Sequence, residues 1–332
     1  HIMAVTMAEI TKLRHLTSAG LMDCKKALAE TNGDIEAAVE ILRKKGQAVA
    51  AKREDRKAAE GCVLAKNEGN FAAVVALNCE TDFVAKNAGF VALTNKILDA
   101  AVANRVKSLD DLKAISIDGL TIADLVVEES GKTGEKTEIS AYEWLEAPTT
   151  SSYNHLGNKL ATIVGFNLEN VGYQVGRDIA MQVASMNPVA VDRDAVPQSV
   201  KDSEISVAIE KTKEEQVKKA VEAALKKAGI NPNLVDSEDH IASNIAKGWL
   251  TEDEAAKARQ IAEETGAAKA ANLPEQMIQN IAQGRLNKFF KESCLMEQEF
   301  IKDGKMNIQQ YLDSQMKGLV AVEFKRVNLN ED

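Results

Sequence analysis

Hydrophobic residues near the start of the chain recur every three or four positions, which is the spacing of helices with one apolar face. Such faces are formed by Ile10, Leu13 and Leu16 and, further on, by Ile35, Ala38, Val39 and Leu42. Residues 7–46 are therefore predicted to form a domain of three short helices. A unit this small has no room for a catalytic cleft and is typical of a docking module.

Polar and glycine residues are predicted to mark the ends of these helices. Asp23 is expected to cap the second helix, and Asp34 the third. Gly46 is expected to end the third helix. The Ala-rich residues 47–58 follow, with the basic side chains Lys52, Arg53, Arg56 and Lys57. This segment is interpreted as a solvated basic linker helix, and a dedicated anion site is the alternative.

Two later segments resemble each other and have the pattern of β-strands. Residues 69–80 and 158–169 both begin with a turn, continue as an apolar run and end in Asn-x-Glu. A glycine-led helix is predicted after each of them, at Gly89 and at Gly176. The duplication predicts two related subdomains, each an antiparallel sheet covered by helices, and hence an α+β fold.

The connection from strand to helix is about two residues longer in the first copy, and the extra length falls on Thr81-Asp82-Phe83. Where duplicated scaffolds differ, the added residues are candidates for function. The ring of Phe83 could pack back onto its own subdomain. Alternatively, it could fill a pocket of a partner protein, with the Asp82 carboxylate competing there for hydrogen bonds or cations.

Residues 200–271 are helical in pattern, charged and rich in alanine. An apolar stripe precedes a stop at Gly229, and Thr251 to Glu254 form a capping box for a later helix that ends near Gly266. An inserted antiparallel helical hairpin is expected, with a further small bundle as the alternative. After it, Pro274 opens another helix, and residues 319–324 are predicted to be a strand that completes the second sheet.

The predicted organisation is a three-helix domain, a basic linker, two core subdomains and an insert within the second of them. The boundaries are 7–46 for the helical domain, 47–58 for the linker, 59–148 for the first core subdomain, 149–199 with 272–330 for the second, and 200–271 for the hairpin.

Charge, hydrophobicity and cysteine content disfavour several classes of function. A formal net charge of −9 disfavours generic nucleic-acid binding, direct DNA binding included. No apolar run is long enough to span a bilayer, and no signal segment is recognised, so a cytoplasmic protein without membrane contact is expected. The four cysteines Cys24, Cys62, Cys79 and Cys294 form no Cys-x-x-Cys pair and are interpreted as reduced, mostly buried thiols.

Motifs for catalysis are weak. Ser130-Gly131-Lys132-Thr133 lacks the earlier glycine of a phosphate loop, because Val126 stands there, and it is interpreted as an exposed turn. The histidines are isolated, so neither a metal site nor a cofactor is expected. Glu80 and Asp82 could form an acid/base pair, but nothing nearby supplies a nucleophile. An enzyme acting on a small molecule is therefore disfavoured.

Residues 78–90, Asn-Cys-Glu-Thr-Asp-Phe-Val-Ala-Lys-Asn-Ala-Gly-Phe, closely resemble the signature of bacterial elongation factor Ts. Residues 19–28, followed by residues 32–38, resemble its N-terminal motif. The similarity covers most of the chain apart from the long hairpin. It implies a ubiquitin-associated-like domain at the N-terminus and a guanine-nucleotide exchange factor for elongation factor Tu, without catalytic residues of its own.

The resemblance also implies which residues bind the partner. Asp82 and Phe83, flanked by Thr81 and Val84, would enter the partner's nucleotide domain near its magnesium site. The other implied contacts are Leu21, Met22 and Lys25 in the N-terminal domain and His155 in the core.

Some features depart from the family pattern. Thr133-Gly134 stands where the family has Ile-Gly, the hairpin is longer, and a C-terminal helical module of many relatives has no counterpart. The hairpin could contact the partner, the ribosome or a second copy of the chain. Two other functions stay open: an adaptor that binds without changing nucleotide affinity, and an enzyme with a cleft between the core halves.

Overall fold

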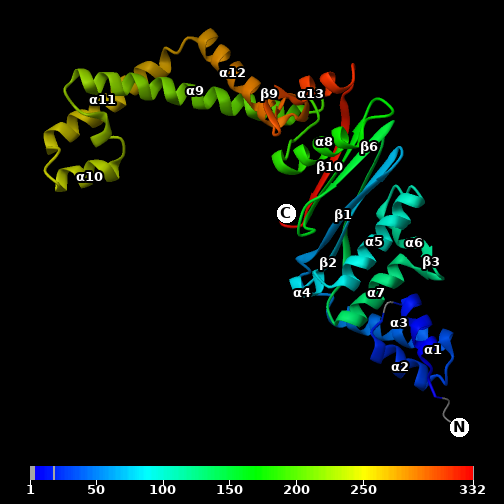
Figure 1. Cartoon of the computed structure of the whole chain (residues 1–332). Helices are drawn as coiled ribbons and strands as arrows, with labels where there is room; N and C mark the ends of the chain where they lie inside the picture. Colours follow the sequence, from blue (N-terminus) through cyan, green and yellow to red (C-terminus); the bar gives the residue numbers. More distant parts are fainter. Residues whose placement is uncertain (1–3, 18, 332) are drawn as a thin grey trace. The chain divides into compact units, whose positions relative to one another are not determined.

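The structure is a computed structural model that describes residues 4–17 and 19–331 (Figure 1). It divides into two compact units. The first extends to Val191 and resumes at Leu295, and the second is Asp192–Cys294. Within the described ranges, no helix is both long enough and apolar enough to cross a membrane.

The first unit begins with three helices around a small apolar core, as the sequence pattern predicts. They are α1 (Met7–Thr17), α2 (Leu21–Glu30) and α3 (Ile35–Lys52). The carboxylate of Asp34 caps α3 by accepting a hydrogen bond from the Ala37 N–H, which confirms that prediction. The predicted cap at Asp23 is wrong, because Gly20 is the N-cap of α2. Asp23 lies inside the helix and pairs with Lys45 of α3 at 2.8 Å.

Gly46 does not end α3, which continues to Lys52. Gly46 is buried where α3 crosses α7 (Ile122–Thr133), and a Cβ atom there would lie 2.5 Å from the Val127 carbonyl oxygen. Gly131 is the matching residue of α7, since its Cβ would lie 2.8 Å from the Gly46 Cα. Glycine at both positions allows the two helix backbones to touch. The prediction that Gly46 ends the helix is therefore wrong, because this glycine serves helix packing and not helix termination.

The same crossing corrects the interpretation of Ser130-Gly131-Lys132-Thr133 as an exposed turn. These residues form the last turn of α7, and Ser130 and Gly131 are buried. The linker-helix interpretation of the basic segment holds for residues 47–52, which continue α3, whereas the helix ends at its C-cap Arg53.

Two three-stranded antiparallel sheets form the core of this unit. The first has the order β1-β2-β5, with β1 Glu60–Glu68, β2 Phe71–Cys79 and β5 Glu138–Glu146. The second has the order β10-β7-β6, with β6 Thr149–Asn154, β7 Leu160–Phe166 and β10 Ala321–Asn328. The duplicated segments supply β2 and β7, the central strand of each sheet. The α+β prediction and the closing strand of the second sheet are thereby confirmed.

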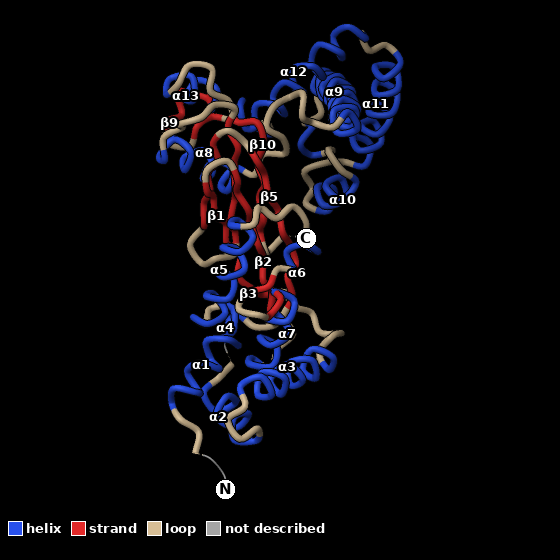
Figure 2. Tube along the Cα trace, turned by 90° about the vertical axis from the view of Figure 1, so that its right-hand side faces the viewer, coloured by secondary structure: helices blue, strands red, loops and turns tan. Residues whose placement is uncertain are grey.

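The two sheets pack on each other, and each is covered by one long helix on its outer face. Alternate side chains of β1 and β2 explain this layering. Phe71, Val75 and Leu77 face α5 (Ala88–Ala103), whereas Val63 and Val74 pack in the layer shared with Ile163 of β7. The second sheet is covered by α8 (Tyr173–Met186), and in Figure 1 α8 and α5 lie on opposite sides of the strands. Figure 2 shows the long strands of both sheets running side by side through this unit.

The connections differ as the sequence comparison predicts. Residues 80–87 join β2 to α5 and include the short helix α4 (Asp82–Ala85), whereas residues 167–172 join β7 to α8. Gly176 does not lead α8, which begins one turn earlier at Tyr173. The remaining elements of this unit are α6 Leu109–Ala114, β3 Ser116–Ile117, β4 Leu120–Thr121, η2 Leu295–Glu297, β8 Glu299–Phe300, β9 Asp303–Asn307 and α13 Ile308–Gln315.

The second unit is entirely helical in its regular structure. Its elements are α9 Gln198–Lys227, η1 Pro232–Leu234, α10 Glu238–Ala246, α11 Glu252–Ala271 and α12 Glu275–Ser293. Helices α9 and α11 form the predicted antiparallel hairpin, and the capping box at Thr251 and Glu254 is confirmed. The predicted end near Gly266 is wrong, because this glycine lies inside α11 against Val217 and Val221 of α9. Helix α12 also packs along α9, so the compact unit is larger than the predicted insert.

Candidate partner-binding site

The short helix α4 presents Phe83 to solvent. Thr81 is its N-cap, and the Thr81 hydroxyl accepts a hydrogen bond from the Val84 N–H. The side chain of Phe83 is 84% exposed. The interpretation that this ring packs back onto its own subdomain is therefore wrong.

Glu135 holds the start of α4 in place. Its carboxylate accepts hydrogen bonds from the Glu80 N–H at 3.0 Å, the Thr81 N–H at 2.9 Å and the Thr81 hydroxyl at 2.7 Å. Glu135 follows Gly134, the left-handed C-cap of α7, whose φ of 75° turns the chain toward α4. The Thr133-Gly134 turn thus positions the residue that holds α4. Whether Thr133-Gly134 also contacts a partner is a separate hypothesis, which was drawn from the sequence alone.

Glu80 adds a second polar connection at the same place. Its carboxylate accepts two hydrogen bonds of 2.6 Å from the Arg53 guanidinium and one of 2.8 Å from the Lys136 N–H. These bonds stabilise the charged form and lower the pKa of Glu80 to about 2. Asp82 is half exposed and pairs with Lys86 at 3.4 Å. Glu80 is thus occupied in holding the backbone and is not free for acid/base chemistry.

The pair of Glu80 and Arg53 should make the first unit sensitive to acid. Because the folded-state pKa of Glu80 lies below the usual value of 4.5, its stabilisation is complete above pH 4.5 and is lost as the pH falls toward 2. We expect Glu80→Gln to lower the free energy of unfolding at pH 7 by about 1–3 kcal/mol. Urea unfolding between pH 2 and 7 should also show a shallower loss of stability in acid for this variant.

A matched control is available in the second unit. Arg259 binds Glu238 through the same two-pronged geometry, at 3.1 and 2.9 Å, but on the surface. Exposed ion pairs contribute little, so Glu238→Gln should leave stability almost unchanged. Equal losses in the two variants would contradict a special role of the pair at Glu80.

His155 lies in the turn between β6 and β7. Its Nδ1 is 3.0 Å from the Tyr153 hydroxyl, and the neighbouring Leu156 is 96% exposed. Lys159 of the same turn pairs at 3.1 Å with Glu60, which lies opposite Cys79 at the end of β2. Because α4 follows that end of β2, the His155 turn and α4 are brought to the same end of the core.

Leu21, Met22 and Lys25 lie in the first turns of α2, within the three-helix domain. All three are exposed, Met22 to 70%. The domain is tied to α4 by α3, whose C-cap Arg53 binds Glu80. The site residues named from the sequence thus come from three separate elements, α2, α4 and the β6–β7 turn, and all lie in the first unit.

Sequence reasoning missed three residues of this site. Arg53 was one basic residue of an apparent linker, and Glu135 carried no motif. Leu156 could have been noticed, because it is an apolar residue beside His155 with only polar residues and a glycine next to it in the sequence. The functional signal of Arg53 and Glu135 depends on tertiary contacts that bring residues 53, 80 and 135 together.

A family model and individual known proteins that resemble this chain all point to the same family. The family model described as "Elongation factor TS" matches residues 80–331. Proteins named elongation factor Ts from Phocaeicola vulgatus, Bacteroides thetaiotaomicron and Porphyromonas gingivalis are 60%, 58% and 44% identical over 331 residues. Each of these matches covers 99% of this chain and 100% of the relative.

All these matches are to translation elongation factors. The chain belongs to the elongation factor Ts family. The helical insert lies inside the matched region, so the expectation that the similarity stops short of it is wrong.

Proposed function

We propose that this chain is a guanine-nucleotide exchange factor for elongation factor Tu and that α4 is its working element. Asp82 and Phe83 enter the partner near the magnesium ion of its nucleotide site. The single observation that carries the proposal is the exposure of Phe83, which is 84%, on a capped helical turn. Family membership supports the choice of partner.

The polar contacts behind α4 explain how an exposed ring could act as a wedge. A flexible ring would lose its binding energy to the cost of ordering side chain and loop. Here Glu135 accepts three hydrogen bonds from the residues that start α4, and Arg53 holds Glu80. The turn is thus ordered before the partner arrives, which favours tight insertion.

Exchange requires no catalytic group in this chain. If the chain binds the nucleotide-free partner more tightly than the GDP-bound partner, thermodynamic linkage requires that it weakens GDP binding by the same factor. Phe83 would supply the steric part of that difference, and the Asp82 carboxylate would compete for polar groups around the magnesium ion. Leu21, Met22 and Lys25 on α2 and His155 in the core would hold the two proteins in register.

Stopped-flow release of a fluorescent GDP analogue from elongation factor Tu tests the proposal. Addition of this chain should raise the release rate in a concentration-dependent and saturable way. An adaptor would bind the partner, as measured by calorimetry, and leave the release rate unchanged. That outcome would reject the exchange function and retain only the interaction.

A further inference from the structure

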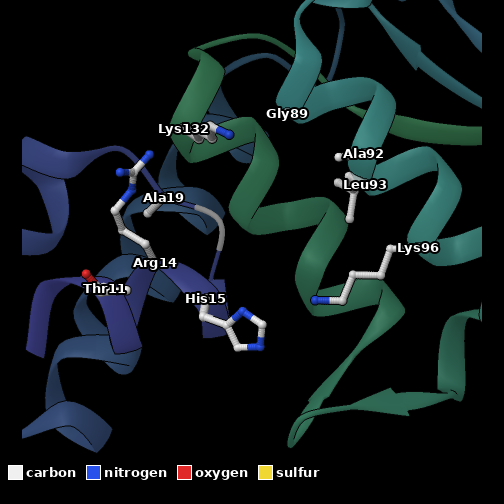
Figure 3. A pocket seen from close by; sticks show the side chains of 9 residues that line it. All are labelled: Thr11, Arg14, His15, Ala19, Gly89, Ala92, Leu93, Lys96 and Lys132. Atoms are coloured by element: carbon white, nitrogen blue, oxygen red, sulfur yellow. The ribbon is translucent and has the colours of Figure 1, made fainter. Parts of the chain in front are cut away.

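A cavity of about 370 Å³ lies between the three-helix domain and the first core subdomain (Figure 3). Its walls come from α1, from Ala19 just before α2, from α5 and from α7. Most of its polar groups are basic. The residues that line it are Thr11, Arg14, His15, Ala19, Gly89, Ala92, Leu93, Lys96 and Lys132.

The basic side chains approach this cavity from opposite walls. Figure 3 shows His15 of α1 and Lys96 of α5 on facing sides, and the Lys132 side chain directed toward Gly89. A Cβ atom on Gly89 would lie 2.6 Å from the Lys132 Nζ. The ammonium group therefore lies directly against the first turn of α5, where glycine leaves room for it.

Positive charge in this cavity is not neutralised by ion pairs. Arg14, Lys96 and Lys132 form no salt bridge within residues 4–17 and 19–331, although the chain as a whole has a net charge of −9. Exposed lysines are often unpaired, but Lys96 and Lys132 are only partly exposed. Arg14 is exposed. Unpaired cations that line one pocket repel one another, and an anion bound among them would replace this repulsion by attraction.

Two buried acidic residues of α7, Glu128 and Glu129, interact electrostatically with these lysines. Burial raises the pKa of each carboxyl group to about 7, against the attraction of Arg43 and then Lys96 on Glu128 and of Lys132 on Glu129. Both are therefore partly protonated near neutral pH, and they do not fully compensate the lysines.

From this arrangement we propose that the cavity binds a small, multiply charged phosphate compound with a diphosphate group. The cavity presents three permanent positive charges. A ligand with a single carboxylate would neutralise only one of them, whereas the charge of a diphosphate matches all three. The volume lies within the usual range of small-molecule sites, about 300–1,000 Å³. The Thr11 hydroxyl and, when protonated, His15 provide further donors.

Binding there would have a consequence for the rest of the unit. Ala19 lies two residues before Leu21, and Gly89 lies shortly after α4. A ligand that contacts both α1 and α5 would fix the three-helix domain against the core. The relative position of the exposed α2 residues and Phe83 would then depend on the ligand. The binding itself is independent of the proposed exchange function.

Isothermal titration calorimetry of the full chain, without any partner protein, tests this site. Inorganic phosphate, pyrophosphate and GDP are titrated at equal ionic strength. We expect saturable binding of pyrophosphate with one site per chain and at least tenfold weaker binding of phosphate. Binding of GDP as tight as pyrophosphate would identify a nucleotide as the source of the diphosphate, and absent GDP binding would identify free pyrophosphate.

Lys96→Gln and Lys132→Gln should each weaken pyrophosphate binding at least tenfold, with circular dichroism confirming that the variants fold. Lys257→Gln is the matched control, because it removes one exposed lysine from α11 in the second unit. Equal weakening in all three variants would show a general charge effect and would overturn the proposal. The absence of saturable heat with pyrophosphate and with GDP would overturn it as well.

Discussion

Phe83→Ala is expected to reduce the stimulated rate of GDP release from elongation factor Tu about 30-fold or more at subsaturating concentration. Central aromatic anchors of interfaces contribute about 2 kcal/mol or more when truncated, which corresponds to that factor. Because the ring is 84% exposed, its removal costs the folded chain almost no packing. The release rate from stopped flow and the thermal unfolding midpoint, measured on the same preparation, separate the two effects.

The chain offers a control for a general loss of exposed aromatic surface. Tyr173, the first residue of α8, is 80% exposed and lies outside α4. Tyr173→Ala should retain most of the stimulated rate, and Phe83→Leu should retain an intermediate rate because it keeps an apolar group at the tip. Full activity of Phe83→Ala would remove the wedge from the mechanism, even if exchange itself is observed.

Gly46→Ala is expected to destabilise the first unit by about 3 kcal/mol, although alanine is the better helix former. The added methyl group would lie 2.5 Å from the Val127 carbonyl oxygen and 3.0 Å from the Glu128 Cα, and both are backbone atoms that cannot move aside. Helices α3 and α7 would have to separate. Native-state hydrogen exchange of the amides of α3 and α7 measures this loss.

Gly284→Ala is the matched control for helix propensity. Gly284 lies inside α12, and apart from the adjoining backbone of its own helix nothing lies within 4 Å of the position that its Cβ would occupy. The substitution should therefore stabilise the second unit by about 0.5–1 kcal/mol. If Gly46→Ala were also neutral or stabilising, the close contact of α3 and α7 would not be a determinant of stability.

Local sequence signals predict much of the fold because they act through neighbouring residues. The cap at Asp34 and the capping box at Thr251 and Glu254 depend on contacts three residues away, and both are confirmed. The duplicated segments are correctly predicted as equivalent strands, since a buried central strand needs the same apolar run in both sheets.

Three of the errors, at Gly46, Gly131 and Gly266, share one physical cause. A glycine ends many helices, yet it is equally needed where two helix backbones meet, and the chain alone does not distinguish these uses. Gly46, Gly131 and Gly266 all lie inside helices and against another element. Their role depends on residues that are far away in sequence.

The exposed residues of the candidate site could be predicted from the sequence, whereas the residues that hold them in place could not. The longer connection between strand and helix pointed to Thr81-Asp82-Phe83, and the ring is indeed exposed. From the residues alone, exposure and burial of Phe83 were equally compatible. The supporting contacts of Arg53 and Glu135 join positions 27 and 54 or more residues apart in the chain, which no periodicity reveals.

The continuity of α3 bears on any attempt to study the helical domain by deletion. The helix has 18 residues, so it is about 27 Å long. It starts in the three-helix core and ends at Arg53, beside Glu80. A chain shortened to begin at Gln47 would be cut inside this helix and would expose the face of α7 that Gly46 covers. A loss of activity after such a truncation could therefore result either from missing binding contacts or from damage to the core. Point substitutions of exposed residues on α2 would test the binding contacts alone.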